Sequence, residues 1–323
     1  MSKNDLSIPS SLHPKPADYA FDLDRALRAV VALRATVPED AFTANTLGTE
    51  RAGSAVHIRQ GLFLTIGYLI TEADSVWLSA SDGQAVAGHV VAYDQETGFG
   101  LVQALGRIEL PLLELGDSTA ARMGESVVFA AAGGRRHAVA AKVARREEFA
   151  GYWEYLLDDA IFTTPAHPFW GGAALIGPAG SLLGIGSLVL QQGGEGGRKQ
   201  DMNMVVPVDL LVPILDDLMA LGQANRPPRP WLGLYAMEDD EALVVGGLAD
   251  NGPADKAGVR AGDRILAVNG EEVPDLAGLW RAVWASGPAG AAVRVSLGRG
   301  SRAASVTIAS TDRSTILKAP LLH

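Results

Sequence analysis

Short apolar runs separated by glycine, aspartate and serine turns recur along the chain from Ala29 onward. Such runs, rich in valine, isoleucine and leucine, are typical of β-strands, and their close spacing is typical of antiparallel barrels or sandwiches. A first strand is expected within the apolar, β-branched stretch 29–37. Further strands are expected over Ala55–Ile58, Leu62–Thr65, Val76–Ser79, Ala85–Val91 and Phe99–Leu105, and a second set from Ser126 to about Val206.

A helical pattern replaces the strand pattern over Val208–Gly222. Apolar residues recur there on one stripe, and Gly222 stands where a helix commonly ends. The stripe consists of Leu210, Leu211, Ile214, Leu215, Leu218 and Met219. The proline-dense segment Asn225–Pro230 follows, and such a segment favours an extended linker because proline fits neither helix interiors nor sheets.

The pattern after the linker alternates between strand and helix. It predicts an independent α+β unit, with strands at Ala242–Gly246 and Arg264–Val268, helices at Pro253–Ala257 and Leu276–Ser286, and a hairpin over Val293–Ile308.

Composition narrows the class of protein. The chain has 323 residues, 48% of them hydrophobic, and a net charge of -10, which disfavours a nucleic-acid or anionic-membrane partner. Cysteine is absent, which excludes disulfides and thiol catalysis. The sequence has no apolar run of about 18 residues and no signal-peptide pattern at its start. We therefore expect no membrane span and a cytoplasmic location, or the cell envelope if a leading segment has been removed.

The six histidines have no metal-ligand spacing. We accordingly expect neither a metal site nor a cofactor.

Several short motifs follow one another in a recognisable order. They are Gly53–Val56 before Gly61–Thr65, Val90–Asp94 with Thr97, Gly171 and Gly172 before Ser181–Ile185, and Val206 and Pro207 followed by the helix and Trp231–Leu234. From about residue 28 to 310, this order resembles the HtrA (DegP-like) family of serine proteases. The resemblance implies a mainly β chain, a chymotrypsin-like double β-barrel followed by an α+β PDZ domain.

The same resemblance suggests domain boundaries. Residues 1–27 would form an N-terminal tail used in oligomerisation, 28–224 the trypsin-like double barrel with its C-terminal helix, and 225–230 the linker. Residues 231–312 would form the PDZ domain and 313–323 a C-terminal tail.

The residues that carry catalysis in the family are different in this chain. The catalytic histidine would stand three residues after Thr65, at Tyr68, and the aspartate would follow Thr97, at Gly98. The nucleophilic serine would precede Gly171, at Trp170. Acyl transfer needs a nucleophile, a base and a carboxylate that orients the base. Pro168, two residues before Trp170, also lacks the N–H that an oxyanion hole would use. We therefore expect a pseudoprotease, not an enzyme, which regulates or scaffolds a partner.

Two other functions remain open. One is a hydrolase with an unorthodox nucleophile, Ser54 or Ser187, served by His57, His89 or His167. The other is a purely structural adaptor. On this alignment Tyr68, Phe169 and Trp170 converge on the cleft between the barrels, and we hypothesise that they fill it as an apolar plug.

Peptide binding is expected in the PDZ domain. The resemblance implies that the backbone of Trp231, Leu232, Gly233 and Leu234 holds a peptide's terminal carboxylate, and that Leu279 and Val283 line the pocket for its last side chain. A hydrophobic C-terminal peptide is the expected ligand. The alternative is a groove closed by Trp280 or by the barrel, which would leave a domain used for assembly.

Two kinds of protein partner are expected. The resemblance implies trimers formed through the N-terminal region, where Tyr19 and Phe21 could supply contacts. An active protease homologue could be a further partner.

Overall fold

The computed structural model describes residues 7–193, 199–239, 242–300 and 302–318. The chain divides into two compact units. Unit 1 comprises Met1–Glu147, Asp159–Asn225 and Lys318–His323, and unit 2 comprises Glu148–Asp158 and Arg226–Leu317. The tip of one long hairpin therefore belongs to unit 2, although its strands begin and end in unit 1.

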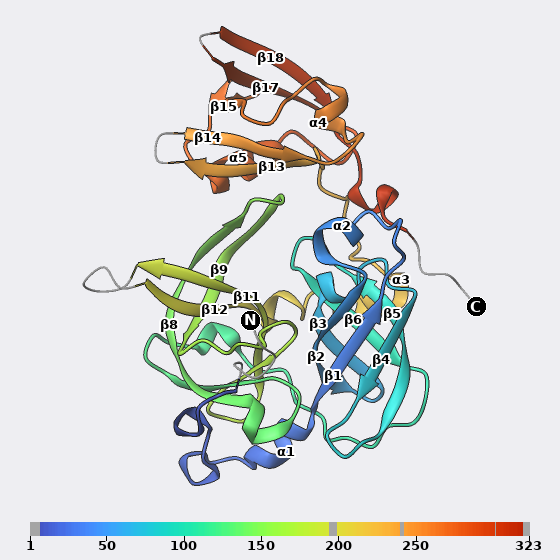
Figure 1. Cartoon of the computed structure of the whole chain (residues 1–323), viewed down its shortest axis with the longest axis vertical. Helices are drawn as coiled ribbons and strands as arrows, with labels where there is room; N and C mark the ends of the chain where they lie inside the picture. Colours follow the sequence, from blue (N-terminus) through green and yellow to red (C-terminus); the bar gives the residue numbers. More distant parts are fainter. Residues whose placement is uncertain (1–6, 194–198, 240–241, 301, 319–323) are drawn as a thin grey trace. The chain divides into compact units, whose positions relative to one another are not determined.

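The first barrel of unit 1 is closed, with strand order β1-β2-β3-β6-β5-β4 (Figure 1). Closure leaves no unpaired strand edge, and every residue of β3 is buried. Helix α1 (Leu23–Arg28) precedes the barrel and α2 (Ala44–Leu47) lies in its first long loop. The strands are β1 (Val30–Thr36), β2 (Glu50–Arg59), β3 (Leu62–Ile66), β4 (Ser75–Ser79), β5 (Ala85–Tyr93) and β6 (Phe99–Ala104).

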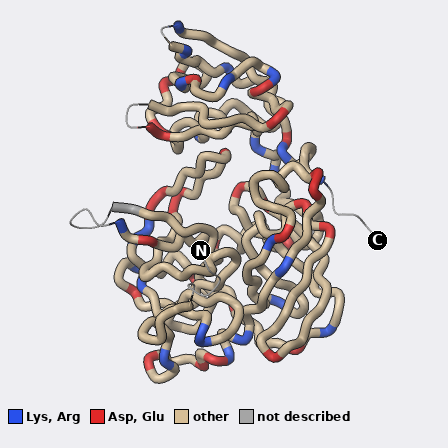
Figure 2. The backbone as a smooth tube through the Cα atoms, viewed as in Figure 1, with Lys and Arg blue, Asp and Glu red and all other residues tan. Residues whose placement is uncertain are grey.

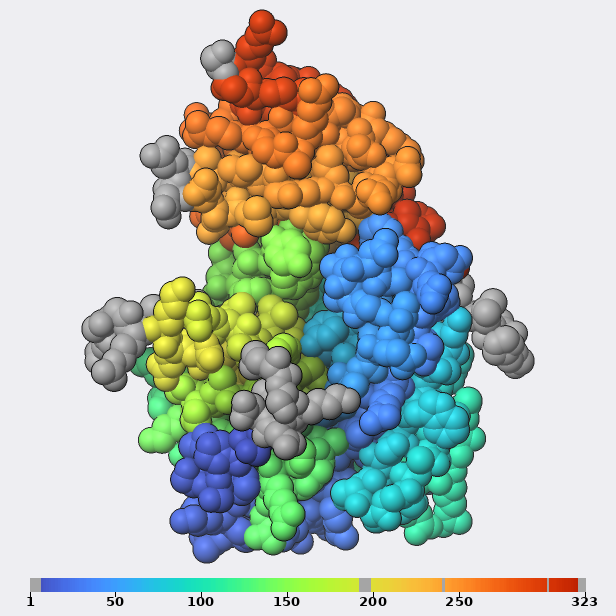
Figure 3. All heavy atoms as spheres, in the orientation of Figure 1, coloured from blue at the N-terminus to red at the C-terminus, as the bar shows by residue number. Residues whose placement is uncertain are grey.

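The second barrel is also closed, with strand order β10-β11-β12-β9-β8-β7. Its core contains Phe129, Ile161 and Leu175, and Ile8 and Leu12 from the N-terminal segment pack against it. Figure 3 shows this barrel, green to yellow, beside the first barrel, blue to cyan. The strands are β7 (Ser126–Ala130), β8 (Ala138–Gly151), β9 (Tyr155–Thr164), β10 (Ala174–Ile176), β11 (Leu182–Gly193) and β12 (Lys199–Pro207).

The segment after the second barrel is less helical than its apolar stripe predicts. A 3-10 turn spans Val208–Leu210, and α3 covers only Leu215–Leu221. Pro213 explains the interruption, because proline lacks an N–H and disfavours helical geometry in the residue before it. The predicted end at Gly222 is confirmed, since this residue is left-handed and its N–H donates to the carbonyl of Leu218.

Unit 2 is an antiparallel sheet with strand order β13-β14-β15-β17-β18, and β16 pairs with β15. Asp275 caps α5 by accepting from the N–H of Gly278, and the apolar face of α5 is buried in the core. The elements are β13 (Leu234–Asp239), β14 (Ala242–Leu248), α4 (Pro253–Lys256), β15 (Arg264–Val268), β16 (Glu271–Glu272), α5 (Leu276–Trp284), β17 (Ala292–Arg299) and β18 (Arg302–Ala309).

The two units together confirm a mainly β chain with a double barrel and an α+β module. Among the described residues, no helix has the length and apolar character needed to cross a bilayer. Figure 2 shows basic and acidic positions interspersed within each unit.

Candidate functional site

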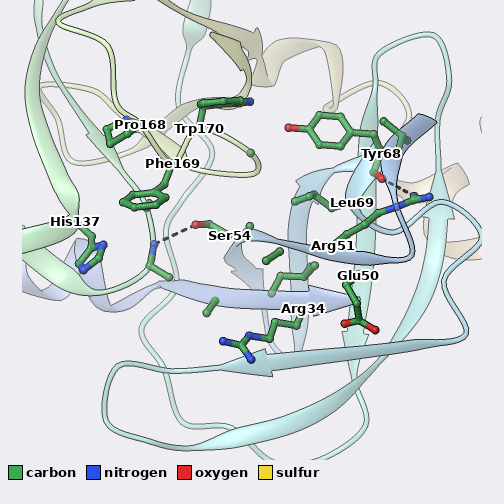
Figure 4. Close-up of a pocket in the computed structure, with 18 residues that line it drawn as sticks. Arg34, Glu50, Arg51, Ser54, Tyr68, Leu69, His137, Pro168, Phe169 and Trp170 are labelled. Atoms are coloured by element: carbon green, nitrogen blue, oxygen red, sulfur yellow. Dashed lines mark hydrogen bonds between the residues drawn. The ribbon is translucent and has the colours of Figure 1, made fainter. Parts of the chain in front are cut away.

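A pocket of about 700 Å³ lies between the two barrels of unit 1 (Figure 4). The first barrel contributes residues of β1, β2 and the turn after β3, and the second contributes the segments around residues 131–137 and 168–171. The polar and aromatic side chains that line it include Arg34, Glu50, Arg51, Ser54, Tyr68, His137, Phe169 and Trp170, and Pro168 lines it as well.

The plug hypothesis is therefore wrong, because the aromatic residues line the cleft without filling it. The side chain of Phe169 is 40% exposed. Trp170 packs partly against the core of the second barrel.

Tyr68, at the position of the family's histidine, is held by a polar contact to the second barrel. Its hydroxyl donates to the carbonyl of Ser187 at 2.9 Å. Burial raises the pKa of Tyr68 well above its ordinary value. The phenol is accordingly neutral at physiological pH and bridges the two barrels.

Gly98, at the position of the family's aspartate, sits in a tight turn. Its φ is 82°, a left-handed conformation that glycine adopts without steric cost. Its N–H donates to the carbonyl of Asp94 at 2.8 Å, and its own carbonyl accepts from the N–H of Gly67 at 2.7 Å. Gly98 thus lies close to the backbone just before Tyr68.

His167 shapes the segment that carries Pro168 and Trp170. The ring is fully buried, its Nδ1 accepts from the N–H of Phe169 at 2.9 Å, and its Nε2 donates to the carbonyl of His137 at 3.0 Å. Desolvation lowers the pKa of His167 to about 4. This histidine is a neutral structural group, with both ring nitrogens engaged.

The Ser–His pairs considered from sequence have other partners. His57 donates from Nδ1 to the carbonyl of Pro111 and accepts at Nε2 from the N–H of Gly61, and burial lowers its pKa. His89 is exposed on β5, and Ser187 is buried on β11.

Ser54 does line the pocket, where its hydroxyl accepts from the N–H of Ala132. His137, which sequence reasoning did not single out, lines the same pocket.

The second candidate site is the loop before β13 in unit 2. The backbone N–H groups of Leu232, Gly233 and Leu234 all donate to the carboxylate of Glu154, at 2.8 to 3.1 Å. Gly233 has a φ of 72°, and a Cβ at this position would stand 2.9 Å from the ring of Trp231. Trp231 itself exchanges backbone hydrogen bonds with Thr311. The loop therefore has the geometry of a carboxylate-binding site.

The α5 residues expected to line a side-chain pocket lie in the same module. Leu279 and Val283 are fully buried in a core cluster that also contains Leu232 and Leu234. Trp280 is fully buried too, and its indole N–H donates to the carbonyl of Gly151 at 2.9 Å.

Glu154, which receives these N–H groups, is a residue that sequence reasoning did not single out. Its side chain is buried, and burial raises the pKa of Glu154 to about 7 against the opposing effect of the N–H donors and Arg313. The described residues contain no group of three or more His, Cys, Asp or Glu arranged to hold a metal ion.

The fold and these sites define a chymotrypsin-like double barrel followed by a PDZ module. Residues 53–185 match the trypsin-like peptidase domain, and residues 230–309 match the PDZ domain. These two domains, in this order, support the HtrA family of serine proteases with a PDZ domain.

Several named serine proteases are similar to this chain in sequence. The chain is 26% identical over 230 residues to the probable periplasmic serine endoprotease DegP-like of Pseudomonas fluorescens, covering 66% of this chain and 46% of the relative. It is 25% identical over 288 residues to the serine endoprotease DegS of Salmonella typhimurium, covering 82% and 79%. The chain thus spans about half the length of the DegP-like relatives it matches.

A solved structure of the HtrA-type protease AlgW with a decapeptide is similar, with a TM-score of 0.53 and 22% identity. The similarity covers 93% of this chain and 98% of that one and supports the fold.

The comparisons correct one prediction. Tyr68, Gly98 and Trp170 led us to expect that the chain is not an enzyme, but the relatives are named serine endoproteases. Similarity to named proteases points to a protease, and the expectation of a non-enzyme is therefore withdrawn.

Proposed function

We propose that the chain is an HtrA-type protein that binds polypeptide segments through the PDZ groove of unit 2. The observation that supports this most directly is the convergence of the N–H groups of Leu232, Gly233 and Leu234 on one carboxylate. Consecutive backbone donors of this kind capture a terminal carboxylate, while an adjacent strand adds the peptide backbone to the sheet. The proposed ligand class is peptides with a hydrophobic C-terminal residue and a free carboxylate.

A matched pair of peptides tests this proposal. A fluorescent peptide ending in a free hydrophobic residue should bind, and the same peptide with an amidated C-terminus should bind at least about tenfold more weakly, because the amide has no charge to offer. Measurements should use both the unsubstituted protein and a Glu154→Ala variant. Failure of both proteins to distinguish the two peptides would contradict the proposal.

Peptide hydrolysis is the second candidate function, favoured by the serine endoprotease names of the relatives. The pocket between the barrels would be its site, with Ser54 as the lining hydroxyl. A fluorophosphonate probe and an unfolded-casein assay test it together. Labelling and turnover that both disappear in Ser54→Ala would support hydrolysis at Ser54, whereas neither signal in the unsubstituted protein would contradict it.

Assembly remains a separate proposal. A homo-trimer, an active protease homologue as partner and a cytoplasmic location all stay predictions. The ring of Phe21 lies 5.4 Å from that of Tyr19 and packs against Gly180 of the second barrel. Light scattering of the purified chain, alone and mixed with an active homologue, tests both kinds of assembly.

A further inference from the structure

The tip of the β8–β9 hairpin contacts the loop of unit 2 that the proposed function assigns to a peptide's terminal carboxylate. Glu154 stands between β8 and β9, and its buried carboxylate receives the N–H groups of Leu232, Gly233 and Leu234. These are the donors that the proposed function assigns to a peptide's terminal carboxylate. A group inside the chain therefore already satisfies them.

The backbone of the hairpin also pairs with the strand that a peptide would join. The N–H of Ala236 on β13 donates to the carbonyl of Tyr152 at 3.0 Å. Leu234 therefore contacts Glu154, and Ala236, two residues later, contacts Tyr152, which lies two residues before Glu154. This is the order of an antiparallel strand added to the sheet edge.

Side chains extend the contact to α5. The indole N–H of Trp280 donates to the carbonyl of Gly151, and Ala150 packs against the core of unit 2. The rings of Tyr152 and Tyr235 meet edge to face with centroids 6.2 Å apart. Carboxylate, backbone and side-chain contacts thus all come from one short turn.

Other features limit the strength of the contact between the tip and the rest of unit 2. Glu154 has a φ of 61°, a left-handed conformation that is unfavourable for a residue with a side chain. The ion pairs of Arg281 with Glu148 and Asp158 are solvent-exposed, so they add little.

We propose that the β8–β9 tip is an internal ligand of the PDZ groove, with the Glu154 side chain standing in for a terminal carboxylate, so that an external peptide binds only by displacing it. This inference rests on the proposed function, because it assigns regulation to the same groove. An occupied groove lowers the apparent affinity for a peptide by the fraction of molecules in which the groove is free. Substitutions that empty the groove should therefore strengthen peptide binding.

The test compares Glu154→Ala and Glu154→Gln with a matched control in the full chain. Glu147→Gln is the control, because it also removes one carboxylate charge from the hairpin. The carboxylate of Glu147, on β8, pairs with Arg145 and not with the loop before β13. Hydrogen exchange of the amides at Leu232–Leu234 reports the internal contact without any ligand, and titration with the hydrophobic C-terminal peptide reports competition. Exchange of the core amides of β17 reports whether each variant is folded.

We expect Glu154→Ala to exchange these loop amides at least about tenfold faster and to bind the peptide at least about tenfold more tightly than the unsubstituted protein. Glu147→Gln should match the unsubstituted protein in both measurements. Unchanged exchange in Glu154→Ala would overturn the inference, and so would equal peptide affinity in the two proteins. If no protein binds the peptide, the proposed function fails and the exchange rates alone decide whether Glu154 is held by the loop.

Discussion

The carboxylate of Glu154 accepts a hydrogen bond from the N–H of Gly233 at 2.8 Å, although the two residues lie 79 positions apart in the sequence. The flanking N–H groups of Leu232 and Leu234 donate to the same carboxylate. The backbone turn around Gly233 aims all of these donors at one point. The properties of the groove therefore depend on both the shape of this turn and the charge of Glu154.

Replacing Gly233 by alanine should destabilise the turn by more than the strain of its left-handed backbone alone. Gly233→Ala forces a side chain into a left-handed residue, at a cost of about 1 to 2 kcal/mol, and its Cβ would press on Trp231. Gly262→Ala is the control, because Gly262 has a φ of 87° and open space around it. We expect Gly233→Ala to lower the free energy of unfolding of unit 2 further than Gly262→Ala and to weaken peptide binding, as measured by urea denaturation and peptide titration. Equal effects of the two substitutions would contradict this.

Peptide binding should strengthen as the pH rises. The pKa of Glu154 is raised to about 7 in the docked tip, whereas a solvated glutamate titrates near 4.3. The docked state therefore binds the proton more tightly, so docking is favoured below pH 4.3 and weakens as the pH rises through 7. The charged and titratable groups that face the tip are Arg313, Tyr235, Tyr152 and Asp250.

The corresponding measurement is peptide affinity between pH 5 and pH 8. We expect an increase of about 10- to 100-fold in the unsubstituted protein, as release of the tip becomes easier. Glu154→Gln carries no titrating group at this position and should show a much smaller change. A pH profile shared by both proteins would exclude Glu154 as its source.

The barrels could be predicted from the sequence because their signals are local. The apolar run that predicts Leu62–Thr65 forms β3, Leu62–Ile66, and the turn residues that separate such runs lie beside them in the chain. A local signal can also override the apolar pattern. The apolar stripe predicts a helix from Val208, but Pro213 shortens it to Leu215–Leu221.

The occupied groove could not be predicted in this way. The turn Gly151–Tyr155 reads as an ordinary hairpin tip, and nothing near Glu154 indicates that its partners are Leu232–Leu234. The open pocket between the barrels could not be predicted for a related reason. Alignment places Tyr68 and Trp170 at the cleft. Whether they fill the cleft or line it depends on the directions of their side chains, and in the structure they line it.

Removing the hydroxyl of Tyr68 should destabilise unit 1. Tyr68→Phe leaves the carbonyl of Ser187 without this donor, at a cost of about 1 to 2 kcal/mol. Tyr152→Phe is the control, since the side chain of Tyr152 is 48% exposed. Chemical denaturation followed by circular dichroism measures both variants. A Tyr68→Phe protein as stable as the control would show that the hydroxyl contributes nothing.

Acid should destabilise the protein through His167. The pKa of His167 is lowered to about 4 in the folded chain, while an unfolded histidine titrates near 6.5. The unfolded state takes up the proton first, so the stability present above pH 6.5 is lost as the pH falls toward 4. Between pH 7 and pH 4.5 this group alone should remove about 2 kcal/mol.

His167→Asn separates this effect from general acid denaturation. The amide oxygen of asparagine can replace Nδ1 as the acceptor for the N–H of Phe169 but does not titrate. Urea unfolding at pH 7 and at pH 4.5 should show that the variant loses about 2 kcal/mol less than the unsubstituted protein. His89→Asn, at an exposed position on β5, should lose as much as the unsubstituted protein does. If His167→Asn and His89→Asn lose the same stability between pH 7 and pH 4.5, burial of His167 does not cause the acid destabilisation. Only the buried ring of His167 would have to break its hydrogen bonds in order to accept a proton.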